Sequence, residues 1–188
     1  MLRLFTEALG SYVLSRISHA SGALVASYAL PGAIPGKDAI NLFLCALAED
    51  AMLRDNEKQY ERSGAEWIAV PPPLRLKCTY IISAWPAAGD KEEAALVQSR
   101  LISAAYAVLV STGTLPAAFL PEPMKDPNLP KPVFALTENT LAGSPEFWAS
   151  LGCAFRPAFT FNATISIPET AEEYGYLVDG LDIGYQIK

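Results

Sequence analysis

Few residues in this chain could carry out catalysis. A serine or cysteine nucleophile needs a base, and His19 is the only histidine among the 188 residues. It stands between Ser18 and Ser21 at the end of an expected helix, where a histidine commonly interacts with free carbonyl groups. We therefore expect no enzymatic activity; a hydrolase that uses His19 is the alternative, and full activity of a His19→Ala variant would exclude it.

Metal, cofactor and phosphate sites are not expected either. The run PGAIPGKD at 31–38 lacks the glycine spacing of a phosphate-binding loop and the Ser or Thr that would follow Lys37. Carboxylate pairs such as Glu92-Glu93 are adjacent in sequence, so the two groups point to different sides of a helix or strand. No pair of cysteines has the spacing of metal ligands, and all three stand in apolar runs typical of reduced core residues: Cys45, Cys78 and Cys153.

Composition points to a protein that packs against other chains. Lys and Arg total 14 against 20 Asp and Glu, a net charge of -6, and the basic residues are scattered. Nucleic-acid binding needs clustered basic side chains and is not expected. Hydrophobic residues make up 51% and charged residues 18%, below the usual charged share of about 25%. This deficit favours an oligomer in which a neighbouring copy covers apolar surface.

One uncharged stretch is long enough to span a bilayer, but its sequence favours a core helix. Residues 101–120 are interrupted by Gly113 and Pro116, and their first half continues a helix that carries charges. The N-terminal segment contains Glu7 and Arg16 where a signal peptide needs an unbroken apolar region. We expect that the protein does not insert into a membrane and that it assembles in the cytoplasm.

The strongest secondary-structure signal is the strand at 74–85. Prolines at 71–73 and at 86 flank it, as expected because proline cannot donate to a sheet ladder. Its residues alternate strictly between two faces, which indicates a strand. One face carries Leu74, Leu76, Cys78, Tyr80, Ile82 and Ala84, and the other carries Arg75, Lys77, Thr79, Ile81, Ser83 and Trp85.

Two long helices and one short helix are predicted. Steps of three and four between apolar residues mark a first helix that begins at Leu2 and ends by Gly22. A second helix starts after the capping residue Asp90 and stops before Gly113. Its predicted inner stripe is Val97, Leu101, Ala104 and Val108. The short helix at 144–152 has Ser144 as its cap and Gly152 at its end.

Together with further strand signals, these elements predict an α+β fold. The expected architecture is a mainly antiparallel sheet of about four or five strands with two principal helices packed on it. The segment at 157–168 is expected to be half-buried with a hydroxyl-rich outer face, and 53–66 to be a loop or hairpin. The other predicted features are strands at 23–30, 39–47 and 133–138, a proline-rich crossing at 121–132, and a turn at Asp179-Gly180. Residues 1–168 are expected to form a single domain, and 169–188 an acidic tail or arm.

Three segments, taken in order, resemble the cap or tail-terminator proteins of phage-tail-like extracellular contractile injection systems, of the virulence-cassette and antifeeding-prophage type. The first ends in the turn Leu53–Glu57, the second is the strand Pro72–Trp85 with its leading prolines, and the third runs from Trp148 to Ile165. The third contains the pattern W-x-x-L-G-x-x-x-R-P. The resemblance covers roughly residues 35 to 168, and some family members carry an additional C-terminal module that the tail here is too short to contain.

The resemblance implies a structural role. Similar proteins form a six-fold ring that ends tube and sheath polymerisation at the end distal to the baseplate. Expected partners are further copies of the chain and the sheath and inner-tube proteins, within a particle that is assembled in the cytoplasm and then released or anchored outside. The alternative is a monomeric small-ligand carrier with a pocket lined by Trp67, Trp85 and Trp148, although packing is the favoured role of these residues.

Seven residues are predicted to lie at contacts with neighbouring subunits. Four belong to the turn after the second strand and three to the outward face of the strand at 74–85. They are Arg54, Asp55, Asn56, Glu57, Arg75, Ile81 and Trp85. Local roles are the alternative: Arg54 could pair with Glu57, and Trp85 could lie under a helix.

Overall fold

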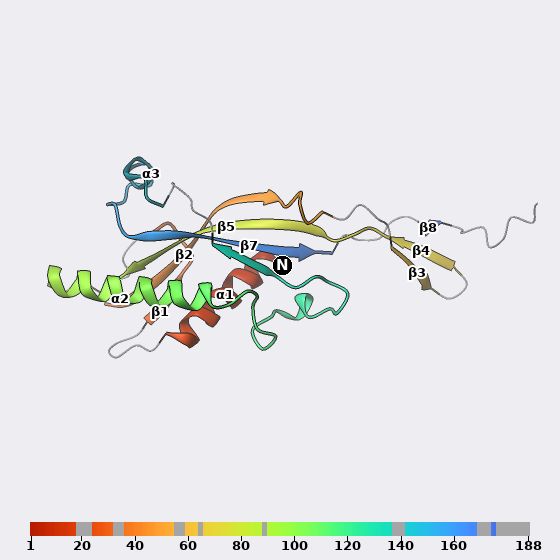
Figure 1. Cartoon of the computed structure of the whole chain (residues 1–188), viewed down its shortest axis with the longest axis horizontal. Helices are drawn as coiled ribbons and strands as arrows, with labels where there is room; N and C mark the ends of the chain where they lie inside the picture. Colours follow the sequence, from red (N-terminus) through yellow and green to blue (C-terminus); the bar gives the residue numbers. More distant parts are fainter. Residues whose placement is uncertain are drawn as a thin grey trace, which may run out of the picture.

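The computed structural model (Figure 1) describes most of the chain. The described residues are 1–17, 24–31, 36–54, 59–63, 66–87, 90–136, 142–168 and 174–175. His19, Gly22, Asp55, Asn56, Glu57 and the Asp179-Gly180 turn lie outside these ranges.

A five-stranded sheet in the order β1-β2-β5-β7-β6 forms the centre of the molecule. Every pairing is antiparallel except that between β1 and β2. The predicted α+β class, with a mainly antiparallel sheet, is therefore confirmed. The strands are β1 (Leu24–Ser27), β2 (Asp38–Glu49), β5 (Leu74–Trp85), β6 (Val133–Leu136) and β7 (Ala158–Ile167).

Strand β5 is the central strand and has the bounds that the sequence predicts. It pairs with β2 along one side and with β7 along the other, so both of its edges are occupied for most of its length. The flanking prolines, Pro71–Pro73 and Pro86, end this pairing because they have no N–H to donate.

Helices α1 (Leu2–Arg16) and α2 (Lys91–Val110) lie on one face of the sheet (Figure 1). The predicted cap of α2 is confirmed, since the Asp90 carboxylate accepts hydrogen bonds from the backbone N–H groups of Glu92 and Glu93. By length and apolar composition, α2 is the one described helix that could also cross a membrane.

The inner stripe of α2 differs from the prediction at two of its four positions, where the buried residue is the one that follows the predicted residue. The buried residues are Leu101, Ala105 and Leu109, whereas Ala104 and Val108 are only partly buried. The other residues of α2 are partly buried or exposed, because only one narrow stripe of the helix is fully covered by the core.

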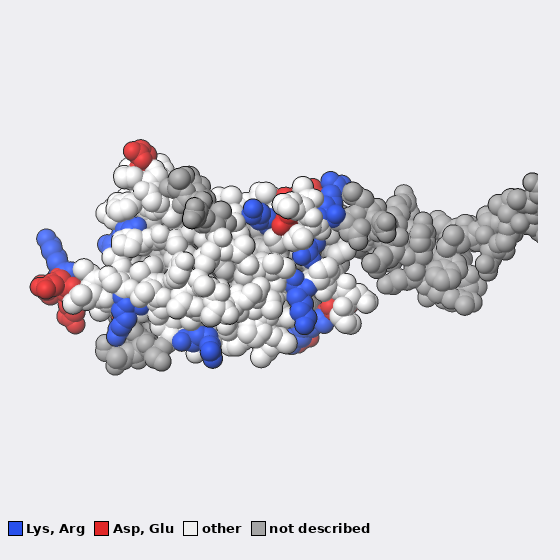
Figure 2. Space-filling view, in the orientation of Figure 1, with Lys and Arg blue, Asp and Glu red and all other residues white. Residues whose placement is uncertain are grey.

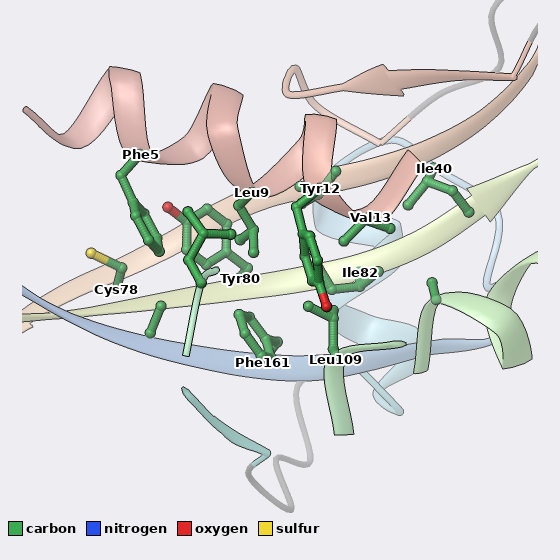
Figure 3. Close-up of a cluster of buried hydrophobic side chains, with 14 of the residues drawn as sticks. Phe5, Leu9, Tyr12, Val13, Ile40, Cys78, Tyr80, Ile82, Leu109 and Phe161 are labelled. Carbon is green, nitrogen blue, oxygen red and sulfur yellow. The ribbon is translucent and has the colours of Figure 1, made fainter. Parts of the chain in front are cut away.

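The main hydrophobic core lies between these helices and the sheet (Figure 3). Phe5 and Leu9 of α1 point toward Tyr80 of β5 and Phe161 of β7, and all four are fully buried. Each such side chain stabilises the fold by roughly 1.5–3 kcal/mol through removal from water. The Tyr80 hydroxyl lies 2.8 Å from the Thr6 hydroxyl, which satisfies both polar groups at the edge of this core.

Two ionisable groups buried in the core predict that the free energy of unfolding falls at alkaline pH. Burial raises the pKa of the Cys78 thiol to about 12, and burial also raises the pKa of the Tyr80 hydroxyl. In the unfolded chain these groups ionise near about 8.5 and 10. As pH rises above these values the unfolded chain releases protons that the folded chain retains, so the free energy of unfolding should fall from about pH 8.5 upward.

Denaturant unfolding of the wild type and of Cys78→Ala between pH 7.5 and 11 checks this prediction. The variant should be less stable at pH 7.5 because a buried side chain is truncated, yet its stability should decline less steeply with pH. Equal slopes for the two proteins would contradict it.

A second, three-stranded sheet extends from one end of the molecule (Figure 1). Strands β3 (Gln59–Ser63) and β4 (Glu66–Val70) form the hairpin, one of the two possibilities predicted for 53–66. Strand β8 (Tyr174–Gly175) adds to β4, so the chain after the predicted domain returns to this hairpin.

The proline-rich crossing contains the short 3-10 helix η1 (Glu122–Met124) and leads to β6, as predicted. The third helix is α3 (Pro145–Ser150), where the Ser144 hydroxyl accepts a hydrogen bond from the Phe147 N–H. It lies on the sheet face opposite α1 and α2 (Figure 1), hereafter the α3 face.

Candidate interaction surface

Two of the predicted contact residues lie in the interior of the chain. Ile81 is fully buried and Trp85 is 5% exposed, because Trp148 of α3 packs over both in a second hydrophobic cluster. The expectation that they face outward is therefore wrong. Trp85 and Trp148 have the packing role that the sequence favoured.

The pattern W-x-x-L-G-x-x-x-R-P builds this cluster. Trp148 is fully buried, and its indole N–H donates to the Ala142 carbonyl over 2.9 Å. Gly152 has φ +70, a left-handed conformation in which glycine ends helices without strain. The chain then returns so that the Arg156 guanidinium lies 4.2 Å from the centre of the Trp85 ring, a cation–π contact. The motif thus fixes α3 to the central strand.

Arg75 is also buried, at 6% exposure, within a polar cluster at the other end of the α3 face. Its guanidinium donates to the Ser166 hydroxyl of β7, which in turn donates to the Pro130 carbonyl. The Thr164 hydroxyl donates to the Asp50 carboxylate over 2.9 Å. Burial lowers the pKa of Arg75, and the negative charge of Asp50 opposes this shift. The expected outward position of Arg75 is therefore also wrong.

The polar face of β7, which lies on the same side of the sheet as Arg75, also differs from the prediction. Its polar side chains were expected on an outer surface, yet all are at most 6% exposed. They lie beside the buried second face of β5, with which they are in register. They are Thr160, Asn162, Thr164 and Ser166.

Arg54 is the predicted contact residue that the structure places at the surface. Its guanidinium forms an ion pair with Glu49 over 3.4 Å, and the two side chains are 58% and 40% exposed. The other members of the predicted turn, Asp55, Asn56 and Glu57, lie outside the described residues. Whether Arg54 contacts a neighbouring subunit stays a prediction.

Sequence reasoning missed an apolar tip beside Arg54. Past a bulge between Leu44 and Ala46, the end of β2 is exposed. Leu47 is 51% exposed, Met52 95% and Leu53 44%. The signal for this tip was the apolar sequence of 46–48 and 51–53, which falls at the junction of the predicted strand at 39–47 and the predicted loop or hairpin at 53–66. Charged groups elsewhere on the visible face are scattered between wide uncharged areas (Figure 2).

Comparison with known proteins places the chain in a family. Residues 5–175 match the family described as the Pvc16 N-terminal domain. The chain belongs to the Pvc16 N-terminal domain family. The resemblance to tail-terminator proteins is thereby confirmed, and the match includes the strands, the helices and the α3 motif described above. No protein with a curated description matches the sequence.

Two solved structures share the fold of this Pvc16 N-terminal domain. One is the sheath/tube terminator, in the extended state, of an extracellular contractile injection system termed PVC, with a TM-score of 0.69 and 17% identity. The other is the tube-terminating cap of the anti-feeding prophage, with a TM-score of 0.64 and 20% identity. They match 100% and 96% of this chain, which spans 64% and 58% of theirs.

Proposed function

We propose that this protein is a structural cap, or tail terminator, of a contractile injection particle. In this role it forms a ring, with six-fold symmetry as in similar proteins, that ends tube and sheath polymerisation at the end distal to the baseplate. The observation that carries the proposal is the family match over residues 5–175, together with a whole-chain structural likeness to two terminator proteins.

The physical requirement for such a cap is asymmetry. A tube or sheath grows because each ring presents an unsatisfied surface to the next, a contact that does not close on itself. A terminator must fit that surface on one side and offer nothing complementary on the other. Within its own ring, however, each copy must contact the next head to tail, and stable contacts of this kind usually bury more than about 1,000 Å².

Features of the chain support a role in assembly rather than turnover. Several buried polar residues of the α3 face bond to other parts of the chain, as in the Arg75–Ser166 and Thr164–Asp50 contacts. Exposed apolar residues occur at the β2 tip, with Leu47 at 51% and Met52 at 95%. The proposed partners are further copies of the chain and the sheath and tube proteins, first in the cytoplasm and then in the extracellular particle.

Electron microscopy of particles made with and without this protein tests the proposal. Without the cap, tubes and sheaths should have a broad distribution of lengths, because no subunit ends their growth. Restoring the wild-type gene should return the narrow distribution. Particles of normal length in the absence of the protein would contradict the proposed function.

A further inference from the structure

Among the described residues, the outer edge of β2 has no paired strand along more than half of its length. Strand β1 pairs with β2 only from Asp38 to Asn41. From Leu42 to Glu49, no described strand pairs with the edge that faces away from β5. The side chains at the end of this stretch are exposed, with Leu47 at 51%.

The outer edge of the sheet at β6 is protected. At β6, the Phe134 N–H donates to the Gly113 carbonyl over 3.0 Å, and Pro130 and Pro132 precede the strand. Natural sheets close or charge their edges in such ways to avoid pairing with other chains. The chain therefore protects its β6 edge, whereas no described strand pairs with the long edge of β2.

The open edge has the composition of a binding site for a strand. Between Leu42 and Ala48 it contains no charged residue and no proline, the two usual means of blocking an edge. The exposed apolar tip at Met52 and Leu53 continues it, and the nearest ion pair, between Arg54 and Glu49, lies at its far end. A long apolar edge of this kind pairs with an extended segment of another chain.

The C-terminal segment of the chain has a matching sequence. In residues 181–187, Leu181, Ile183, Tyr185 and Ile187 alternate with Asp182, Gly184 and Gln186, the period of a half-buried strand. The last described residue before it is Gly175, at the second sheet. Five residues, 176–180, connect Gly175 to this segment, and at about 3.3 Å per residue they could span roughly 17 Å.

We propose that residues 181–187 of one copy add as a strand to the open edge of β2, Leu42–Glu49, in the next copy. The inference rests on the proposed ring, because an edge and a tail are the two different surfaces that a head-to-tail contact requires. Each copy then donates one strand and receives one. Backbone hydrogen bonds supply the affinity, and the alternating apolar residues set the register.

Two single substitutions and their mixture test the exchange. Leu47→Lys places a charge on the exposed edge, and Ile183→Pro removes a backbone donor from the tail. Each should move the midpoint of self-association to a concentration at least about tenfold higher, since the loss of one hydrogen bond and its apolar contact corresponds to about that factor. Leu96→Lys, on an exposed residue of α2, and Ile183→Val are the matched controls and should assemble like the wild type.

The mixture distinguishes exchange between copies from other effects. A Leu47→Lys copy still has an intact tail, and an Ile183→Pro copy still has an intact edge. Sedimentation velocity should therefore detect 1:1 heterodimers in the mixture and monomers of each variant alone. A labelled peptide of residues 181–188 should also bind the Ile183→Pro protein, whose β2 edge is intact. It should not bind the double variant Leu47→Lys/Ile183→Pro.

Three results would overturn the inference. One is normal assembly of both variants, and another is failure of the peptide to bind. The third is a wild-type protein that stays monomeric because its tail occupies its own β2 edge. The peptide then cannot bind it, and the mixture of the two variants forms no heterodimer. None of these outcomes would affect the proposed function, which fails only if particles made without the protein keep their normal length.

Discussion

Replacement of Trp148 by alanine is expected to lower the free energy of unfolding by about 3–5 kcal/mol, the usual cost of truncating a fully buried tryptophan. The indole is 0% exposed and covers Ile81 and Trp85 of the central strand. Its N–H also donates to Ala142. The substitution leaves a large cavity and removes the contact that holds α3, a helix of six residues, against the sheet.

Chemical denaturation followed by tryptophan fluorescence measures this effect, because Trp85 would become exposed to water. Phe155→Ala is the matched control, since Phe155 follows the same helix but is 55% exposed. It should change stability by less than about 0.5 kcal/mol. Trp148→Phe should fall between the two. A Trp148→Ala protein as stable as the Phe155→Ala protein would show that α3 is not anchored as described.

The sequence predicted the elements of this fold better than it predicted their exposure. The strict alternation at 74–85 and the flanking prolines set β5 to the residue, and the Asp90 and Ser144 caps start α2 and α3 as expected. These are local signals, which depend on backbone geometry within a few residues. The family resemblance also rested on local motifs that the structure brings together, such as Trp148 and Arg156 around Trp85.

Burial of the α3 face could not be predicted in the same way. A period of two shows that a strand has two faces and does not tell what covers each of them. The polar residues of β7 looked exposed by composition. They are buried because Ser166 and Thr164 find partners in Pro130 and Asp50, residues distant in sequence. The open edge of β2 was hidden for a related reason, since an apolar run cannot distinguish a central strand from an edge that awaits another chain.

Replacement of Arg75 by methionine is expected to lower the free energy of unfolding by about 2–3 kcal/mol, even though methionine fills much of the same volume. Arg75 is 6% exposed, and its charge lies near Asp50 at the point where β2 ends. The Asp50 N–H donates to the Arg75 carbonyl over 2.7 Å, so the two residues also meet through the backbone. Removing the guanidinium takes a positive charge from the neighbourhood of the Asp50 carboxylate and leaves the buried Ser166 hydroxyl without a donor, which costs more than loss of an exposed contact would.

A double-mutant cycle separates this effect from loss of packing. Asp50→Asn removes the charge but keeps the shape, and the double variant Arg75→Met/Asp50→Asn should be more stable than the sum of the single losses predicts, by about 1 kcal/mol or more. The exposed pair of Arg54 and Glu49 is the matched control near the same end of β2. The corresponding cycle there should give a coupling below about 0.5 kcal/mol, because water screens both charges. Equal coupling in the two cycles would mean that burial of Arg75 does not strengthen its interaction with Asp50.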